Sequence, residues 1–198
     1  EGAVVFEDYS FAPPQWKGWS FGNCDLGLKP NFRKLAKASL DREGKCAMSA
    51  PLWADSGLPK AAVRATAQGT VFEDGGRPAT ARASAVLHYY PYYIGSTLES
   101  WMRLDNGLAP MIRFACVKPD GSRHGEPRTL SATLERIDSV YSYRRQSNGW
   151  ETWDCERIRK IVVPSVKIVV PAGEDATFEI PAGTCGDYAL TVTDSETG

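Results

Sequence analysis

Apolar and polar positions alternate with a period of two residues through most of the chain. Alternation of this kind is typical of β-strands that bury one face. The clearest case joins two runs, 63–72 and 78–90, through the turn Asp74-Gly75-Gly76. An Asp-Gly turn between alternating runs predicts a β-hairpin. The second run is expected to be half buried, with these residues on one face: Ala81, Ala83, Ala85, Leu87 and Tyr89.

The same pattern continues in the second half of the chain, where turn sequences separate further runs. In one of them, Cys116 shares an apolar face with Ile112 and Phe114. Helical periodicity is weak, and residues 31–40 fit either a short helix or an extended connector. The strands expected in this half are 111–117, 129–143, 150–159, 166–170, 176–180 and 187–193.

Many short strands separated by Gly and Pro turns predict an all-β chain of two tandem antiparallel β-sandwich domains of the immunoglobulin or fibronectin type. A mixed polar stretch near residues 96–106 marks the boundary between them. We therefore expect one domain over residues 1–97, lacking its first strand, and a second over residues 98–198. The 198 residues suffice for two domains of ordinary size.

Composition excludes several classes of protein. The net charge is -1 and the pI is about 6.2, so nucleic-acid binding has little electrostatic support. No apolar run reaches the roughly 20 residues that span a bilayer, and no signal-peptide pattern opens the chain. We expect the isolated segment to be monomeric.

The five cysteines show no C-x-x-C spacing, which argues against zinc and thioredoxin-type sites. Wide spacing without metal partners favours disulfides in an oxidising compartment, although five reduced thiols in a cytosolic protein fit the sequence too. We predict the bonds Cys24–Cys46 and Cys155–Cys185, each inside one domain, with Cys116 left as a buried thiol. Pairing of Cys116 with Cys155 or with Cys185 is the alternative.

Catalytic and cofactor signatures are missing from the sequence. There is no Gly-x-Ser-x-Gly motif, and the only histidines are His88, within a strand, and His124, in a loop. Acidic pairs such as Glu73-Asp74 fit solvated turns better than paired catalytic carboxylates. We therefore expect no enzyme activity, no metal and no cofactor.

Aromatic residues gather in three clusters. They fit sugar-stacking or protein-binding platforms, but we interpret them as core and domain-packing residues because antiparallel hairpins commonly pair aromatics across strands. The clusters are Trp16, Trp19 and Phe21; Tyr89, Tyr90, Tyr92 and Tyr93; and Tyr141, Tyr143, Trp150 and Trp153.

Four segments resemble a known family. The chain ends in FEIPAGTCGDYALTVTDSETG, which is similar to the last two strands of macroglobulin-like domains. The segment DSVYSYRRQSNGWETWDCERI resembles a long aromatic hairpin of such a domain in bacterial alpha-2-macroglobulins. The first half resembles the preceding domain through VFEDYSFAPPQWKGWSFGN and VRATAQGTVFEDGGRPATARASAVLHYYPYYIG. The resemblance covers nearly the whole chain.

The resemblance implies two consecutive macroglobulin-like domains that serve as non-catalytic scaffold in a large periplasmic proteinase trap, with the inner membrane as the expected anchor of the parent protein. Its partners would be other domains of the same parent chain and, through the whole protein, host or competitor proteinases. The thioester motif Cys-x-Glu-Gln does not occur in these residues. The alternative function is a tandem of adhesive or carbohydrate-binding sandwich domains on a cell surface.

Overall fold

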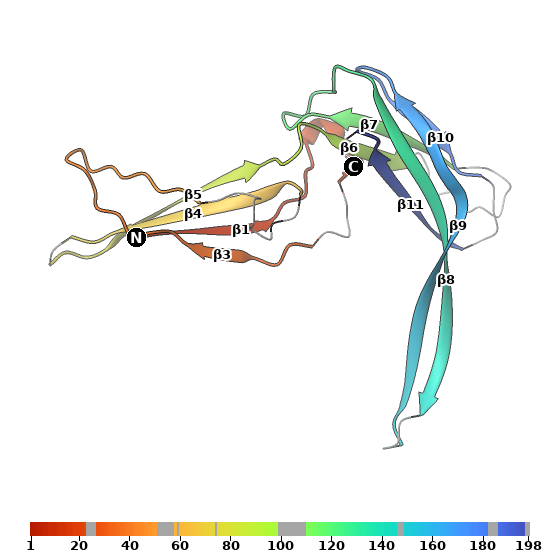
Figure 1. Cartoon of the computed structure of the whole chain (residues 1–198), viewed down its shortest axis with the longest axis horizontal. Helices are drawn as coiled ribbons and strands as arrows, with labels where there is room; N and C mark the ends of the chain where they lie inside the picture. The colour runs from red at the N-terminus through yellow and green to blue at the C-terminus, as the bar shows by residue number, and fades with distance from the viewer. Residues whose placement is uncertain are drawn as a thin grey trace. The chain divides into compact units, whose positions relative to one another are not determined.

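The computed structural model of the chain describes residues 1–22, 27–50, 58, 60–73, 75–98, 110–145, 149–181 and 186–196. Those residues form antiparallel β-strands and one 3-10 turn, so the all-β prediction is confirmed. The chain divides into two compact units (Figure 1). The first comprises residues 1–93 with 118–121, and the second comprises residues 94–117 with 122–198. The predicted boundary between residues 97 and 98 stays a prediction.

The first unit contains a four-stranded antiparallel sheet in the order β3-β1-β4-β5. Val4 and Phe6 alternate along β1 and pack with Leu58 and Val63 in a buried cluster. A period of two along the strand thus places alternate side chains in the core. The unit's elements are β1 (Gly2–Asp8), the 3-10 turn η1 (Pro14–Trp16), β2 (Ser20–Phe21), β3 (Asn31–Lys34), β4 (Val63–Val71) and β5 (Ala79–Leu87).

The hairpin predicted over residues 63–90 is confirmed, because β4 pairs with β5 from Val63↔Leu87 to Val71↔Ala79. The expected half burial of β5 is wrong for most of the strand. Residues 79–85 are exposed on both faces, and burial begins only at Val86 and Leu87. The reason is tertiary, since the outer part of the hairpin extends beyond the side chains that make the core.

The segment of residues 31–40 adopts the extended alternative. Asn31–Lys34 forms β3, which pairs with β1 in the register Val5↔Phe32, and the described residues 35–40 contain no helix. Leu35 continues the contact by donating its backbone N–H to the Gly2 carbonyl at 2.9 Å.

The second unit contains two sheets that share an apolar core. In one, β10, β7 and β6 are neighbours in that order; in the other, the order is β11-β8-β9. Buried residues of this unit come from both sheets: Phe114, Ala115, Cys116, Val117, Leu130, Ala132, Leu134, Ile168, Val170 and Ala176. The strands are β6 (Tyr93–Leu98), which begins at the junction of the units, β7 (Met111–Val117), β8 (Arg128–Arg145), β9 (Glu151–Val170), β10 (Ala176–Glu179) and β11 (Asp187–Asp194).

The two strands expected at 150–159 and 166–170 are one continuous strand, β9. Pro164 lies between them and cannot donate a ladder hydrogen bond, which made a break plausible. The structure accommodates it differently. The pairing of β8 with β9 shifts register between Val163 and Val166 and again between Ile161 and Val163, so the strand bulges and continues.

Candidate functional site

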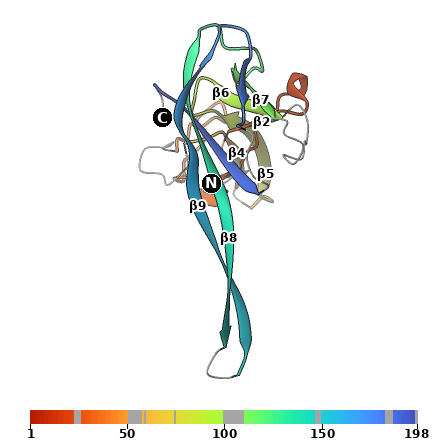
Figure 2. The same cartoon turned by 90° about the vertical axis from the view of Figure 1, so that its right-hand side faces the viewer.

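The outer part of the β8–β9 hairpin is a two-stranded ribbon. The third strand of this sheet, β11, pairs with β8 only as far as Ile137. Beyond that point, among the described residues, β8 pairs with β9 alone, from Asp138↔Ile158 to Arg145↔Glu151. In Figure 2 this twisted ribbon continues past the other strands of the second unit. We call residues 138–145 and 151–158 the outer ribbon.

One face of the outer ribbon is aromatic. Residues directly opposite each other in an antiparallel pair lie on the same face. The register Tyr143↔Trp153 and Tyr141↔Cys155 therefore places three large rings and a thiol together. The rings of Tyr143 and Trp153 meet edge to face, with centroids 5.1 Å apart. Tyr141 and Trp153 are 67% and 70% exposed, so this aromatic face meets solvent in the described structure.

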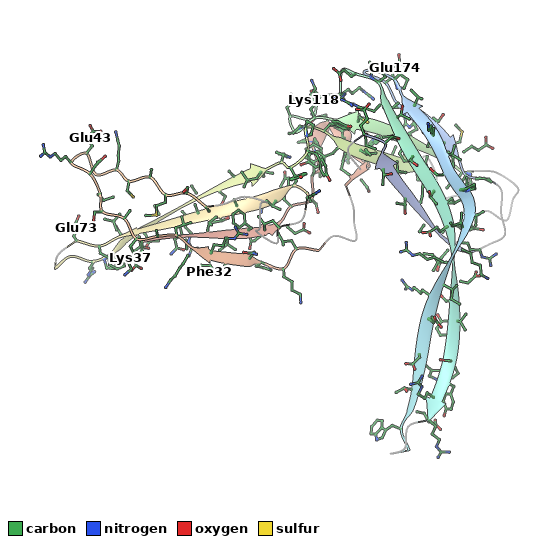
Figure 3. The ribbon with its side chains drawn as sticks, in the orientation of Figure 1. Phe32, Lys37, Glu43, Glu73, Lys118 and Glu174 are labelled. Carbon is green, nitrogen blue, oxygen red and sulfur yellow. The ribbon has the colours of Figure 1, made fainter. Side chains whose placement is uncertain are left out.

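The opposite face of the outer ribbon is polar at the corresponding level. It carries Ser142 opposite Asp154 and Arg144 opposite Thr152. The Arg144 guanidinium lies 3.8 Å from the Asp154 carboxylate, and both side chains are exposed. Nearer the root this face also carries Val140 and Ile158, so it is polar only toward the tip. Side chains project from both faces of the ribbon (Figure 3).

Ion pairs mark the root of the outer ribbon. Lys160 and Arg136 lie 2.8 Å and 2.9 Å from the carboxylate of Asp138. The hydrogen bond from Lys160 is the main cause that lowers the pKa of Asp138. At the far end, a hydrogen bond with the Glu151 carboxylate raises the pKa of Tyr143. Charged groups thus lie at both ends of the outer ribbon, with Asp138 on the face opposite the rings and Glu151 at the far end of the aromatic face.

The core interpretation of the aromatic clusters is wrong for the third cluster. Tyr141, Tyr143, Trp150 and Trp153 are all exposed in the described structure. The other two clusters contain buried members, namely Trp16, Tyr92 and Tyr93. The aromatic content of a cluster therefore does not tell a covered face from an exposed one.

The two histidines occupy separate environments. His88 is half-buried beside Phe11, its Nδ1 lies 2.9 Å from the Tyr93 hydroxyl, and burial lowers its pKa. Burial also raises the pKa of Tyr93 to about 12. His124 is a loop residue whose Nδ1 accepts from the backbone N–H of Glu126 at 3.2 Å. These contacts fit the structural roles expected from the sequence.

Acidic residues of the turns are engaged with basic neighbours or with solvent. Asp175 accepts from Arg123 and lies 3.9 Å from Arg113. Glu7 and Asp8 are exposed at the end of β1. Within the described ranges, no group of three or more His, Cys, Asp or Glu side chains is arranged to hold a metal ion. Among those same residues, no helix is long and apolar enough to cross a membrane.

The structure describes only three of the five cysteines on which the disulfide predictions rest. Cys24 and Cys185 lie outside the described residues, so both predicted disulfides stay predictions. Cys46 and Cys155, the other two members, are exposed free thiols in the described structure. Cys116 is a buried free thiol within the described residues, and burial raises its pKa to about 11.

Peptide mapping without reduction should find Cys24 linked to Cys46 and Cys155 linked to Cys185. Cys116 should resist alkylation at pH 8 in the folded chain, because its thiol is buried and ionises only near pH 11. In denaturant it should react at the rate of an ordinary thiol. A Cys116 peptide linked to Cys155 or Cys185 would refute the pairing, and five free thiols would refute the oxidising compartment.

Comparison with known proteins assigns both halves. Residues 1–88 match the family described as "Bacterial Alpha-2-macroglobulin MG5 domain". Residues 99–198 match "Bacterial macroglobulin domain 6". The chain is 24% identical over 200 residues to the alpha-2-macroglobulin of Rickettsia conorii (strain ATCC VR-613 / Malish 7), covering 98% of this chain and 10% of that protein.

Solved structures show the same fold. The native conformation of Escherichia coli alpha-2-macroglobulin matches with a TM-score of 0.62 at 16% identity, over 98% of this chain and 13% of that one. The same protein activated by porcine elastase matches with a TM-score of 0.61 at 19% identity, over 96% and 17%. The chain thus spans about a tenth of the curated relative's length. The two consecutive domain matches place the chain in the bacterial alpha-2-macroglobulin family.

Proposed function

We propose that the chain is a non-catalytic scaffold segment of a periplasmic proteinase trap. The observation that carries this proposal is the match of two consecutive macroglobulin domains over nearly the whole chain. The described residues support it, since the two histidines lie apart in structural contacts. A solved relative is described as activated by porcine elastase, which indicates the kind of protein a trap of this family meets.

In this proposal the segment works through its rigidity. Its sheets bury apolar side chains from paired strands, so each unit responds to force as one body. Such units can transmit a rearrangement begun elsewhere in the parent chain. The likeness to bacterial alpha-2-macroglobulins supports a periplasmic location, and we expect the parent to be held at the inner membrane.

The isolated 198-residue chain should neither cleave nor inhibit a proteinase. Elastase mixed with a molar excess of the chain should hydrolyse casein and a small peptide substrate at unchanged rates. The full-length parent should slow casein hydrolysis while sparing the small peptide, because a caged proteinase remains open to small molecules. Stoichiometric inhibition by the segment alone would overturn the scaffold assignment.

The alternative function, carbohydrate binding, is favoured by one observation. The exposed rings of Tyr141 and Trp153 offer faces on which a sugar can stack. Glycan-array binding that is lost in Trp153→Ser would support this alternative, whereas no binding by the intact chain would exclude it.

A further inference from the structure

The outer ribbon presents an exposed aromatic face that no described residue covers. A two-stranded hairpin alone is marginally stable in water and gains stability when a third strand or another surface packs on it. In the part of the chain that the structure describes, β11 pairs with β8 as far as Ile137, and β8 pairs with β9 alone from Asp138 to Arg145. The exposed rings of this stretch lie mainly on one face. The opposite face carries the exposed aliphatic side chains Val140 and Ile158 near its root but no ring, so the larger exposed apolar surface is on the aromatic side. An exposed apolar surface of this kind marks an interaction site.

The chemistry of the aromatic face defines what would fit it. Its centre is the edge-to-face pair Tyr143 and Trp153 with Tyr141 beside it. At its root Arg157 stands opposite Ser139, exposed, and no carboxylate of the described residues forms an ion pair with it. An apolar centre with a charged rim is the usual anatomy of a protein interface. The complementary surface would be apolar, with a carboxylate facing Arg157.

The family relation indicates which surface would cover the aromatic face, namely another domain of the same polypeptide. The chain covers only 10% of the Rickettsia conorii relative, so a parent of similar length would hold about nine tenths of its residues outside this segment. Tethered domains meet at millimolar effective concentration without any diffusional encounter. A proteinase or a second copy would have to be captured from solution and would leave the ribbon bare in between.

We propose that the aromatic face of the outer ribbon docks on another domain of the same parent chain, through an apolar sheet surface that presents a carboxylate to Arg157. This rests on the proposed function only in that the segment belongs to a longer polypeptide. The contact would connect the second unit to another domain of the parent. A movement of that domain during a rearrangement of the trap would then be transmitted to the second unit through the ribbon.

Photo-crosslinking in the full-length parent tests the proposal. Benzoylphenylalanine replaces Tyr141 on the aromatic face or, as the matched control, Ser142 on the polar face of the same strand. Position 141 should yield crosslinks within one chain, to residues outside these 198, at about ten times the yield of position 142 or more. Trp153→Ser should reduce the yield from position 141, because it removes the ring beside the probe.

Several results would overturn the docking. One is equal yield from positions 141 and 142. Another is crosslinks between chains in a mixture of isotopically labelled and unlabelled parent, which would identify a second copy as the occupant. A third is crosslinks that form only with added proteinase. Trapping of elastase is measured on the same proteins, so loss of trapping with the intrachain crosslink intact would refute the function and leave the docking.

A charge reversal tests the rim separately. Arg157→Glu should reduce the crosslink yield from position 141 several-fold, because it would place two carboxylates together across the contact. The matched control is Arg144→Glu, on the opposite face of the ribbon, which should leave the yield unchanged. Equal effects of the two substitutions would refute the predicted carboxylate on the partner surface.

Discussion

Replacing Phe6 with alanine should lower the free energy of unfolding of the first unit by about 3–5 kcal/mol. Among the described residues of this unit, Phe6 is the most buried large side chain, and it packs with Val4, Leu58 and Val63. The Arg33 guanidinium lies 5.0 Å from the centre of its ring. Truncation removes the transfer energy of the ring and leaves a cavity in a sheet with few other large core residues. Urea denaturation followed by circular dichroism measures the loss.

Phe32→Ala is the matched control. Phe32 lies on the neighbouring strand β3, opposite Val5, but its side chain is 63% exposed (Figure 3). Its truncation should change the free energy of unfolding by no more than about 0.5 kcal/mol. Equal losses from the two substitutions would contradict the placement of the core on the Phe6 side of the sheet.

The strands and hairpins of this fold could be predicted because their signals are local. Alternation over 63–72 and 78–90 with a Gly turn between them predicts a hairpin without reference to the rest of the chain, and β4 and β5 form as expected. The run of Ile112, Phe114 and Cys116 likewise predicted β7, with Phe114 and Cys116 buried. In these places one short stretch carries both the backbone preference and the apolar face.

Burial could not be predicted as well, because alternation separates two faces without saying what covers either. The alanines of β5 and the rings of the outer ribbon alternate as regularly as Val4 and Phe6 do, yet they are exposed. Whether a face is covered depends on how far neighbouring strands extend, as the end of β11 opposite Ile137 shows. The length of a neighbouring strand depends on its own residues, which lie far away in the sequence from the face that the strand covers.

For the candidate site, the strand pairing could be predicted from the sequence but the burial could not. The sequence identified the aromatic residues of the β8–β9 hairpin, and their cross-strand pairing is confirmed by Tyr143↔Trp153. Their exposure contradicts the core interpretation. Nothing in the sequence pointed to the inclusion of residues 118–121 in the first unit, because the contact that holds them joins positions 105 residues apart.

Replacing Trp16 with alanine should destabilise the first unit by about 3–5 kcal/mol, because it removes that contact together with a buried ring. Trp16 ends the 3-10 turn, and its indole N–H donates to the Gly121 carbonyl at 2.8 Å. Its ring also meets Trp19 and Phe21 edge to face, with centroids 4.9 and 5.9 Å away. The change combines lost apolar burial with a lost buried hydrogen bond, and urea denaturation again measures it.

Trp16→Phe separates the two contributions. Phenylalanine keeps much of the apolar ring but has no N–H to donate to Gly121, so the expected loss is about 1–3 kcal/mol. Its effect should therefore fall clearly below that of Trp16→Ala. If both substitutions cost the same, the hydrogen bond to Gly121 would hold this turn, and ring burial would contribute little. A loss below about 1 kcal/mol for Trp16→Ala would show that residues 118–121 do not pack on the turn in solution.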